Sequence, residues 1–214
     1  MFVSLLSVII STTSPSMPPI TGDHPFAFTE RVPLVDDTRE DYVRYRLEVP
    51  GSKVTAGQAE VLIPASSEEV LAVLRDFEGY KDFLPFFTYS KVQAVNPSSA
   101  ELRLKAKILK GTVEIDAQVK AVKSRLSDGA DRIDLQYIRG NIERFDARFR
   151  VYSLGEDSTF VVFYLMIDPD LWFARNKTLS EYNWVNCGRA VRALREEVLK
   201  GQAEAQAPKP TQAK

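Results

Sequence analysis

Residues 63–87 read IPASSEEVLAVLRDFEGYKDFLPFF, and along this stretch the periodicity of the chain changes. Ser66 and Glu69 have the spacing of a capping box, in which the two side chains satisfy free backbone donors at the start of a helix. The apolar residues that follow recur at helical spacing until Gly79, a residue type that commonly ends helices. They are Val70, Leu71, Val73, Leu74 and Phe77. The stretch predicts a helix of about three turns that leads into the aromatic run YKDFLPFF.

The sequence before this helix alternates with a period of two residues. In DYVRYRLEV (41–49), one phase holds Val43, Tyr45, Leu47 and Val49, and the other holds Tyr42, Arg44, Arg46 and Glu48. This pattern is typical of a half-buried strand. Pro50 and Gly51 supply the backbone angles of a type II turn, and a second strand is expected from about Val54 to Ile63. The two segments predict a hairpin.

Period-two segments return after the aromatic run, in close succession. They are SAELRLKAKIL (99–109), TVEIDAQVKAV (112–122), DRIDLQYI (131–138) and IERFDARFRVYSL (142–154). Their connections are too short for a crossover helix, so they predict an antiparallel meander with one solvated face. The next segment, STFVVFYLMID (158–168), is apolar in both phases. We expect this strand to be covered on both faces.

The last regular segment is a long amphipathic helix, expected from about Leu179 to Leu199 after a break at Asp168-Pro169-Asp170. Its apolar stripe holds Trp184, Cys187, Val191, Leu194 and Val198. Such a stripe needs an apolar surface, and the sheet supplies one. The fold class predicted is α+β: a curved antiparallel sheet with short N-terminal helices and a long C-terminal helix over an apolar cavity.

The two ends of the chain differ from this folded unit of residues 41–200. Residues 1–40 contain a short hydrophobic run, Phe2 to Ile10, followed by a flexible segment rich in proline, and residues 201–214 predict a disordered tail. The hydrophobic run has the length of a signal-peptide core but lacks basic residues before it. The pattern favours export, to the periplasm or medium, over a cytoplasmic location, which stays open as the alternative.

Composition and motifs exclude several classes of function. The net charge of -1 arises from 28 basic and 29 acidic residues, so nucleic acid is not an expected partner. Cys187 is the single cysteine and His24, in the proline-rich segment, is the single histidine. No disulfide, cysteine-based zinc site or histidine catalysis is therefore expected, and Cys187 is predicted to be a buried structural thiol.

The order of these segments resembles the START-like, or SRPBCC, superfamily with its helix-grip fold. The resemblance rests on IPASSEEV (63–70), on the Y-x-x-F-L-P pattern at Tyr80 to Pro85, and on Asp168-Pro169 before the last helix. Within the superfamily the chain is most similar to polyketide cyclase/dehydrase and coenzyme Q-binding START-like proteins. The resemblance covers residues 41–200 and implies a deep hydrophobic pocket between sheet and C-terminal helix, usually without a metal or cofactor. The pocket would hold a lipid, a quinone or a polycyclic molecule, and transient membrane contact is an accompanying expectation.

The expected ligand-binding residues come from three parts of the chain: the aromatic run, the inward phase of the strands and the last helix. They are Phe83, Leu84, Phe86, Leu104, Ala106, Ala117, Tyr137, Phe149, Trp184, Cys187, Gly188 and Val191. Small residues among them leave room for a ligand or, alternatively, let helix and sheet approach closely. The aromatic run is expected to form the lip of the pocket, with Lys81 and Asp82 turned toward water. Filling of the core is the competing interpretation.

Three classes of function follow from this layout. Non-enzymatic binding or transport of a hydrophobic small molecule is the leading hypothesis, because it needs apolar surface alone. The second is a cyclase or dehydratase acting through pocket side chains, for which the candidates are Tyr89, Tyr137, Tyr164, Arg144, Asp146 and Arg148. Because the charged residues of 144–150 alternate with apolar ones, they are expected on a solvated face instead. The third is a protein-interaction module that would use YKDFLPFF as an exposed patch.

Overall fold

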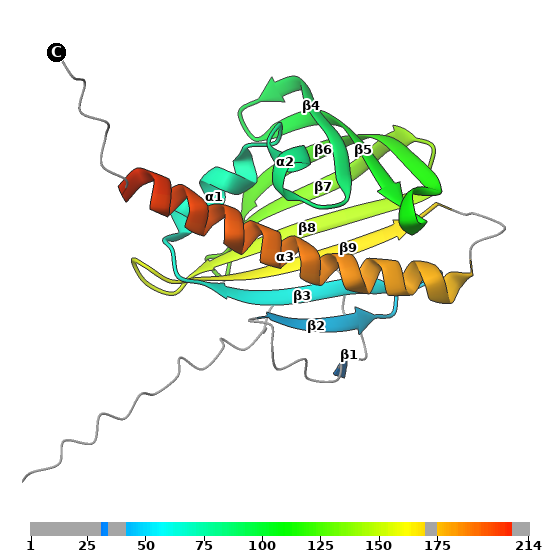
Figure 1. The fold of residues 1–214 in the computed structure, drawn as a ribbon, viewed down its shortest axis with the longest axis horizontal. Coiled ribbons are helices and arrows are strands. Elements are labelled where there is room, and N and C mark those ends of the chain that lie inside the picture. Colours follow the sequence, from blue (N-terminus) through cyan, green and yellow to red (C-terminus); the bar gives the residue numbers. More distant parts are fainter. Residues whose placement is uncertain (1–30, 34–41, 170–174, 207–214) are drawn as a thin grey trace, which may run out of the picture.

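In a computed structural model, which describes residues 31–33, 42–169 and 175–206, the chain forms one antiparallel sheet with helices on one side (Figure 1). The strand order is β1-β2-β3-β9-β8-β7-β6-β5-β4. The strands are β1 (Arg31–Pro33), β2 (Tyr42–Leu47), β3 (Ala56–Ile63), β4 (Phe87–Asn96), β5 (Ser99–Ile108), β6 (Val113–Arg125), β7 (Asp131–Gly140), β8 (Arg144–Ser153) and β9 (Thr159–Asp168). The predicted meander is confirmed, because each strand from β4 to β8 is paired with the next strand along the chain.

The helices are α1 (Ser67–Arg75), α2 (Tyr80–Phe83) and the long α3 (Asn176–Gln206), and a short 3-10 turn, η1 (Leu109–Gly111), joins β5 to β6. Figure 1 shows α3 crossing the sheet diagonally, with α1 and α2 on the same side. The α+β helix-grip fold predicted from the sequence is thus confirmed. The predicted leader, most of which falls in the undescribed 1–30 and 34–41, and the last part of the tail, 207–214, lie outside the described residues.

Local signals in the sequence explain the boundaries of several elements. At the start of α1, the Glu69 amide donates to Ser66 Oγ at 3.3 Å and the Ser66 amide donates to Glu69 Oε2 at 2.8 Å, so the capping box is formed. Between β2 and β3, the Ser52 amide donates to the Val49 carbonyl at 3.0 Å and Gly51 has a φ of 76°. These are the features of the predicted type II turn.

Helix α3 continues to Gln206, beyond the end expected near Leu199. The added turns read KGQAEAQ, in which alanine, glutamine, glutamate and lysine are good helix formers despite one glycine. A disordered tail was expected at residues 201–214 because they have no apolar face. The lack of an apolar face ends packing on the sheet but does not by itself end a helix.

The register assigns each side chain of the sheet to the inner face, under α3, or to the outer face. Val61, Ala59 and Gly57 of β3 share the inner face with their cross-strand partners in β9 and β8. These inner residues join α1, α2 and α3 in one large cluster of buried apolar side chains. A second, smaller cluster on the outer face includes Leu47, Tyr164 and Met166. Strand β9 is therefore buried on both faces, as predicted.

Candidate functional site

Most of the predicted ligand-binding residues lie together on the inner side of the sheet. Leu104, Ala106, Ala117 and Phe149 come from β5, β6 and β8, and the cross-strand register places Leu104 opposite Ala117. The buried cluster that contains these four also contains Leu84, Phe86, Cys187 and Val191, and Phe83 and Tyr137 pack at its margin. The rings of Phe149 and Phe163, on the neighbouring strands β8 and β9, are stacked with their centroids 4.2 Å apart.

Two predicted residues, Trp184 and Gly188, point elsewhere, toward the edge strand β2. The Arg44 guanidinium lies 4.0 Å from the centroid of the Trp184 ring. A Cβ atom placed on Gly188 would lie 2.5 Å from the Tyr42 ring and 2.7 Å from Arg44 Cδ. Trp184 and Gly188 therefore pack α3 against β2, outside the group described above.

The middle of α3 lies directly on β3, because small residues meet there. A Cβ atom on Gly57 would lie 2.7 Å from the Asn183 carbonyl carbon and 2.9 Å from Cys187 Sγ, distances that real Cβ atoms do not show. At Gly57 and Cys187, small size therefore serves the close approach of helix and sheet. Burial raises the pKa of the Cys187 thiol, which agrees with the predicted structural role.

Asn183 fixes the position of α3 at this close approach. Its side-chain oxygen accepts a hydrogen bond from the Ile167 amide at 3.1 Å, and its amide nitrogen donates to the Thr55 carbonyl at 3.0 Å and the Ile167 carbonyl at 3.2 Å. Asn183 is completely buried, so these bonds satisfy backbone groups that have no access to water. The helix is thereby tied to the ends of β3 and β9.

Tyr182 and Asn186 occupy the opposite side of α3 from Trp184. Successive helix residues are about 100° apart, so with Asn183 facing β3 and β9 and Trp184 facing β2, Tyr182 faces away from β2, toward the curled strands. Its ring packs against the large buried cluster. The Tyr182 hydroxyl is buried and has no hydrogen-bond partner among the described residues, and burial raises its pKa. An unsatisfied buried hydroxyl on this side is available to a ligand.

Sequence reasoning missed Tyr182 and Asn186. The signal was present, because Leu179, Tyr182 and Asn186 follow the i, i+3, i+7 spacing of a helix face. The predicted stripe of this helix contains only its hydrophobic members from Trp184 onward, so Tyr182 and Asn186 are not among them. Asn186 is buried, and its side-chain amide donates to the Tyr182 carbonyl at 2.8 Å.

The run YKDFLPFF forms α2 and the turn that leads into β4. Tyr80 is completely buried and Leu84, Phe86 and Phe87 are also buried, which shows that the run is not an exposed patch as the interaction-module hypothesis required. Phe83 is half-buried. Lys81 and Asp82 form an ion pair at 2.7 Å with side chains 42% and 69% exposed, so they face water as expected. Whether Phe83, Leu84 and Phe86 border a pocket stays a prediction.

The six candidate catalytic residues are divided between the two faces. Arg148 is paired across strands with Tyr164, and Asp146 with Met166, on the outer face of β8 and β9. Arg144 lies on this face too, opposite Asp168, and Tyr89 lies on the outer face of β4 opposite Lys105. Tyr137, opposite Val119, is the member of the set on the inner face. A catalytic pocket under α3 would therefore have Tyr137 alone of these six groups.

The expectation of a solvated charged face on β8 is wrong. Arg150 is 6% exposed, and the Arg148 side chain is 11% exposed and forms an ion pair with Asp134. Burial raises the pKa of Asp146 and of Tyr164. Alternation along a strand distinguishes its two faces, but it does not say whether the second face is covered. Here the second face is largely covered, because Arg144, Asp146 and Arg148 are half-buried and Arg150 is buried.

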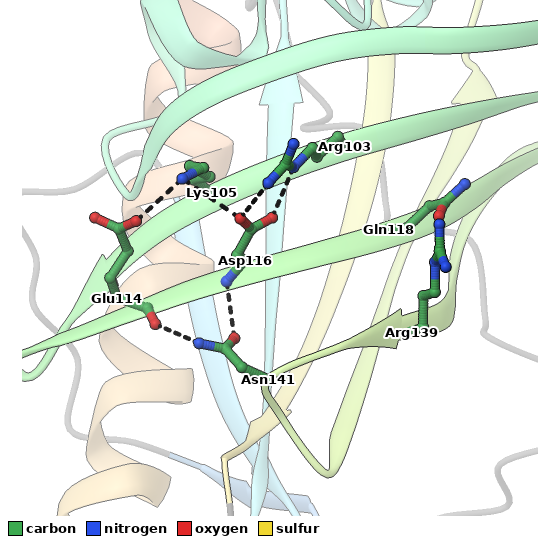
Figure 2. A network of polar contacts seen from close by, with 7 residues as sticks. All are labelled: Arg103, Lys105, Glu114, Asp116, Gln118, Arg139 and Asn141. Carbon is green, nitrogen blue, oxygen red and sulfur yellow. Dashed lines mark hydrogen bonds and ion pairs between the residues drawn. The ribbon is translucent and has the colours of Figure 1, made fainter.

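The outer faces of β5 and β6 are solvated and hold an ordered polar network (Figure 2). Arg103 donates through Nε and Nη2 to the two carboxylate oxygens of Asp116, at 3.0 and 2.7 Å. The Lys105 ammonium lies 3.3 Å from Glu114 and 3.4 Å from Asp116. Hydrogen bonding from Arg103 lowers the pKa of Asp116, which stays ionised at neutral pH.

Three further side chains, those of Asn141, Arg139 and Gln118, form hydrogen bonds beside this network (Figure 2). Asn141 accepts from the Asp116 amide and donates to the Glu114 carbonyl, both at 2.8 Å, and Arg139 donates to Gln118 at 2.8 Å. A shallow cavity of about 520 Å³ lies beside these residues. Because Arg103 and Asp116 pair with each other and Arg139 is held by Gln118, we assign the network a role in holding the strands in register.

The described residues contain no group of histidine, cysteine, aspartate or glutamate side chains arranged to hold a metal ion. Within the same ranges, no helix is both long enough and apolar enough to cross a membrane.

Comparison with known structures places this architecture among START-like proteins. A STAR-related lipid transfer protein from Xanthomonas axonopodis is 17% identical with a TM-score of 0.69, over 79% of this chain and 98% of that one. Human STARD10 is 12% identical with a TM-score of 0.68, over 85% and 78% of the two chains. The Zhui aromatase/cyclase from Streptomyces sp. R1128 is 14% identical with a TM-score of 0.58, over 72% and 98%. At these identities the likeness establishes the fold.

No curated protein matches the sequence. A family model described as polyketide cyclase/dehydrase and lipid transport matches residues 63–180, more than half of the chain. This range begins at the end of β3 and runs through α1, the meander and the first turns of α3. The protein therefore belongs to the polyketide cyclase/dehydrase and lipid transport family.

Proposed function

We propose that the protein binds and carries a hydrophobic small molecule, a lipid, a quinone or a polycyclic compound, between α3 and the inner face of the curled strands. The observation that carries the proposal is the composition of this interior. The inward residues of β5, β6 and β8 are aliphatic, aromatic or alanine, whereas five of the six candidate catalytic groups belong to the outer face. Apolar surface suffices for binding such molecules, and catalysis needs more.

Organic extraction of the purified protein followed by mass spectrometry tests this function. We expect an apolar compound to co-purify, and we expect cis-parinaric acid, a fluorescent fatty acid, to bind at a saturable site. Ala106→Phe adds a ring at a buried inner position and should lower this binding at least tenfold. Lys107→Ala, at the next residue on the exposed face, is the matched control. Absence of any extracted compound together with non-saturable fluorescence would refute the carrier function.

The Tyr182 hydroxyl is the group that we expect to bind the polar end of such a ligand. Tyr182→Phe removes no hydrogen bond within the described protein, so the free energy of unfolding should change by less than about 1 kcal/mol. Affinity for cis-parinaric acid should fall by about 3- to 10-fold, the value of one hydrogen bond. Fluorescence titration measures the affinity and urea unfolding measures the stability.

Tyr152→Phe is the control for this substitution, because Tyr152 is a half-buried phenol on the outer face of β8. It should leave the affinity unchanged. Equal affinities for the Tyr182→Phe variant and the unmodified protein would show that this hydroxyl does not contact the ligand.

A further inference from the structure

A second cavity, of about 400 Å³, lies at the end of the sheet near α1. The β6–β7 hairpin extends here beyond the β4–β5 turn, and the last hydrogen bond between them runs from the Lys123 amide to the Ser98 carbonyl at 2.8 Å. Beyond this point the edge of β6 is open, and side chains from both of its faces flank the cavity. We call this cavity the basic groove. It is lined by Leu71, Arg75, Pro97, Ser98, Lys123, Ser124, Arg125, Asp131, Arg132 and Ile133.

The charge of the basic groove distinguishes it from the shallow cavity on the outer face. Four of its lining residues are cationic, namely Arg75, Lys123, Arg125 and Arg132, and Asp131 is the single carboxylate among them. Asp131 pairs with Arg125 at 3.0 Å. The groove therefore concentrates positive charge on a protein whose net charge is -1.

Two of the four cations have no carboxylate partner. Arg132 forms an ion pair with Asp134, whose Oδ2 lies 2.8 Å from the Arg132 Nε. Across the described parts of the chain, neither Arg75 nor Lys123 takes part in an ion pair. Arg75 ends α1 and Lys123 stands on β6, so the two approach the groove from different walls. These two are available to an anion from outside the protein.

The remaining lining supplies a hydroxyl and an apolar floor. Ser124 Oγ is buried and has no hydrogen-bond partner in the described ranges. Leu71 and Ile133 are buried members of the large inner cluster, and Lys123 is the cross-strand neighbour of Ile133. The groove thus has positively charged side chains at its walls and apolar side chains at its base.

We propose that the basic groove binds a phosphate monoester with a short apolar substituent. A phosphate dianion offers several acceptor oxygens, which suits a site where Arg75 and Lys123 lack a carboxylate partner and two further arginines lie nearby. The apolar substituent contacts Leu71 and Ile133. The same phosphate chemistry occurs in free metabolites and in lipid headgroups. The site is separate from the proposed carrier function, and either can fail without the other.

Titration with hexyl phosphate at constant ionic strength tests the proposal. Calorimetry and amide chemical shifts measure the binding. We expect one saturable site whose shifted amides include 123–125 and 131–133, and no binding of hexanol. The double variant Arg75→Ala/Lys123→Ala should bind at least tenfold more weakly. Lys107→Ala and Lys120→Ala, which remove exposed charges elsewhere on the sheet, should bind as the unmodified protein does.

Vesicles containing phosphatidate distinguish the two sources of phosphate. Binding of hexyl phosphate without vesicle binding assigns the groove to free phosphate esters, and binding of both assigns it to headgroups as well. Binding of vesicles alone, or equal losses in the Lys107→Ala control, would overturn the proposal in favour of general surface electrostatics. If Lys123→Ala lowers the melting temperature, Lys123→Gln keeps the first part of the carbon stem and removes the charge, and unchanged affinity in that variant would also overturn the proposal.

Discussion

Tyr80→Ala is expected to destabilise the protein by about 3–5 kcal/mol, the range for removing a fully buried aromatic side chain. Tyr80 is completely buried among Phe77, Phe83 and Phe87, with ring centroids 5.7 to 6.3 Å away. Its hydroxyl donates to the Leu74 carbonyl at 2.7 Å, near the C-terminus of α1. The substitution therefore removes ring packing and a bond to one of the last carbonyls of the helix. Urea unfolding followed by circular dichroism measures the loss.

Tyr80→Phe separates the two contributions. It keeps the ring and leaves the Leu74 carbonyl without this donor, which should cost about 1–3 kcal/mol. A cost for Tyr80→Ala no larger than that for Tyr80→Phe would show that packing of the ring contributes nothing, contrary to the burial observed.

Gly57→Ala is expected to cost about 3 kcal/mol, the upper end of the usual range for overpacking. The new methyl group would collide with the backbone of Asn183 and with Cys187 Sγ. A helix backbone held by the three Asn183 hydrogen bonds cannot move aside without loosening α3 along the sheet. Thermal and urea unfolding measure this change, and weaker binding of cis-parinaric acid should accompany it if α3 covers the ligand.

Gly188→Ala is the matched control in the same contact region. Its methyl group would meet the side chains of Tyr42 and Arg44, which are half-buried at the sheet edge and can turn away. Replacing a helix glycine by alanine also gains about 1 kcal/mol of helix propensity. The net effect should be close to zero. If Gly188→Ala lowered the free energy of unfolding as much as Gly57→Ala, the distinction between a clash with backbone and a clash with movable side chains would be contradicted.

Much of the fold could be predicted because its signals are local. The capping box at Ser66 and Glu69, the turn at Pro50-Gly51 and the alternation in β5 and β6 depend on neighbours in sequence, and each was found where expected. The aromatic run was harder to interpret. Its composition fits a core or a pocket lip equally, and the burial of Tyr80 and Phe87 shows that much of it is core.

Which residues form the candidate site depends on where each side chain points, and the spacing of residues in the sequence does not fix those directions. Trp184 and Cys187 belong to one apolar stripe, yet Trp184 packs against β2 and Cys187 against Gly57 of β3, because the stripe is wide enough to contact several strands. The inward position of Tyr182 follows from the same geometry. The residues that line the basic groove come from α1, the β4–β5 turn and the β6–β7 hairpin, which are far apart in sequence.

The sequence alone determined the α+β class, the succession of strands along the chain, the start of α1 and the apolar character of the interior, since these follow from periodicity and capping between near neighbours. The helix ends at Arg75, before the predicted end at Gly79. Only the tertiary structure decided that the charged face of β8 is largely covered, that α3 touches β3 at Gly57, and that Arg75 and Lys123 border one groove. The physical reason is that burial and the meeting of charges depend on which surfaces cover one another. Which surfaces meet is a property of the folded chain, and no periodic pattern within a single segment indicates it.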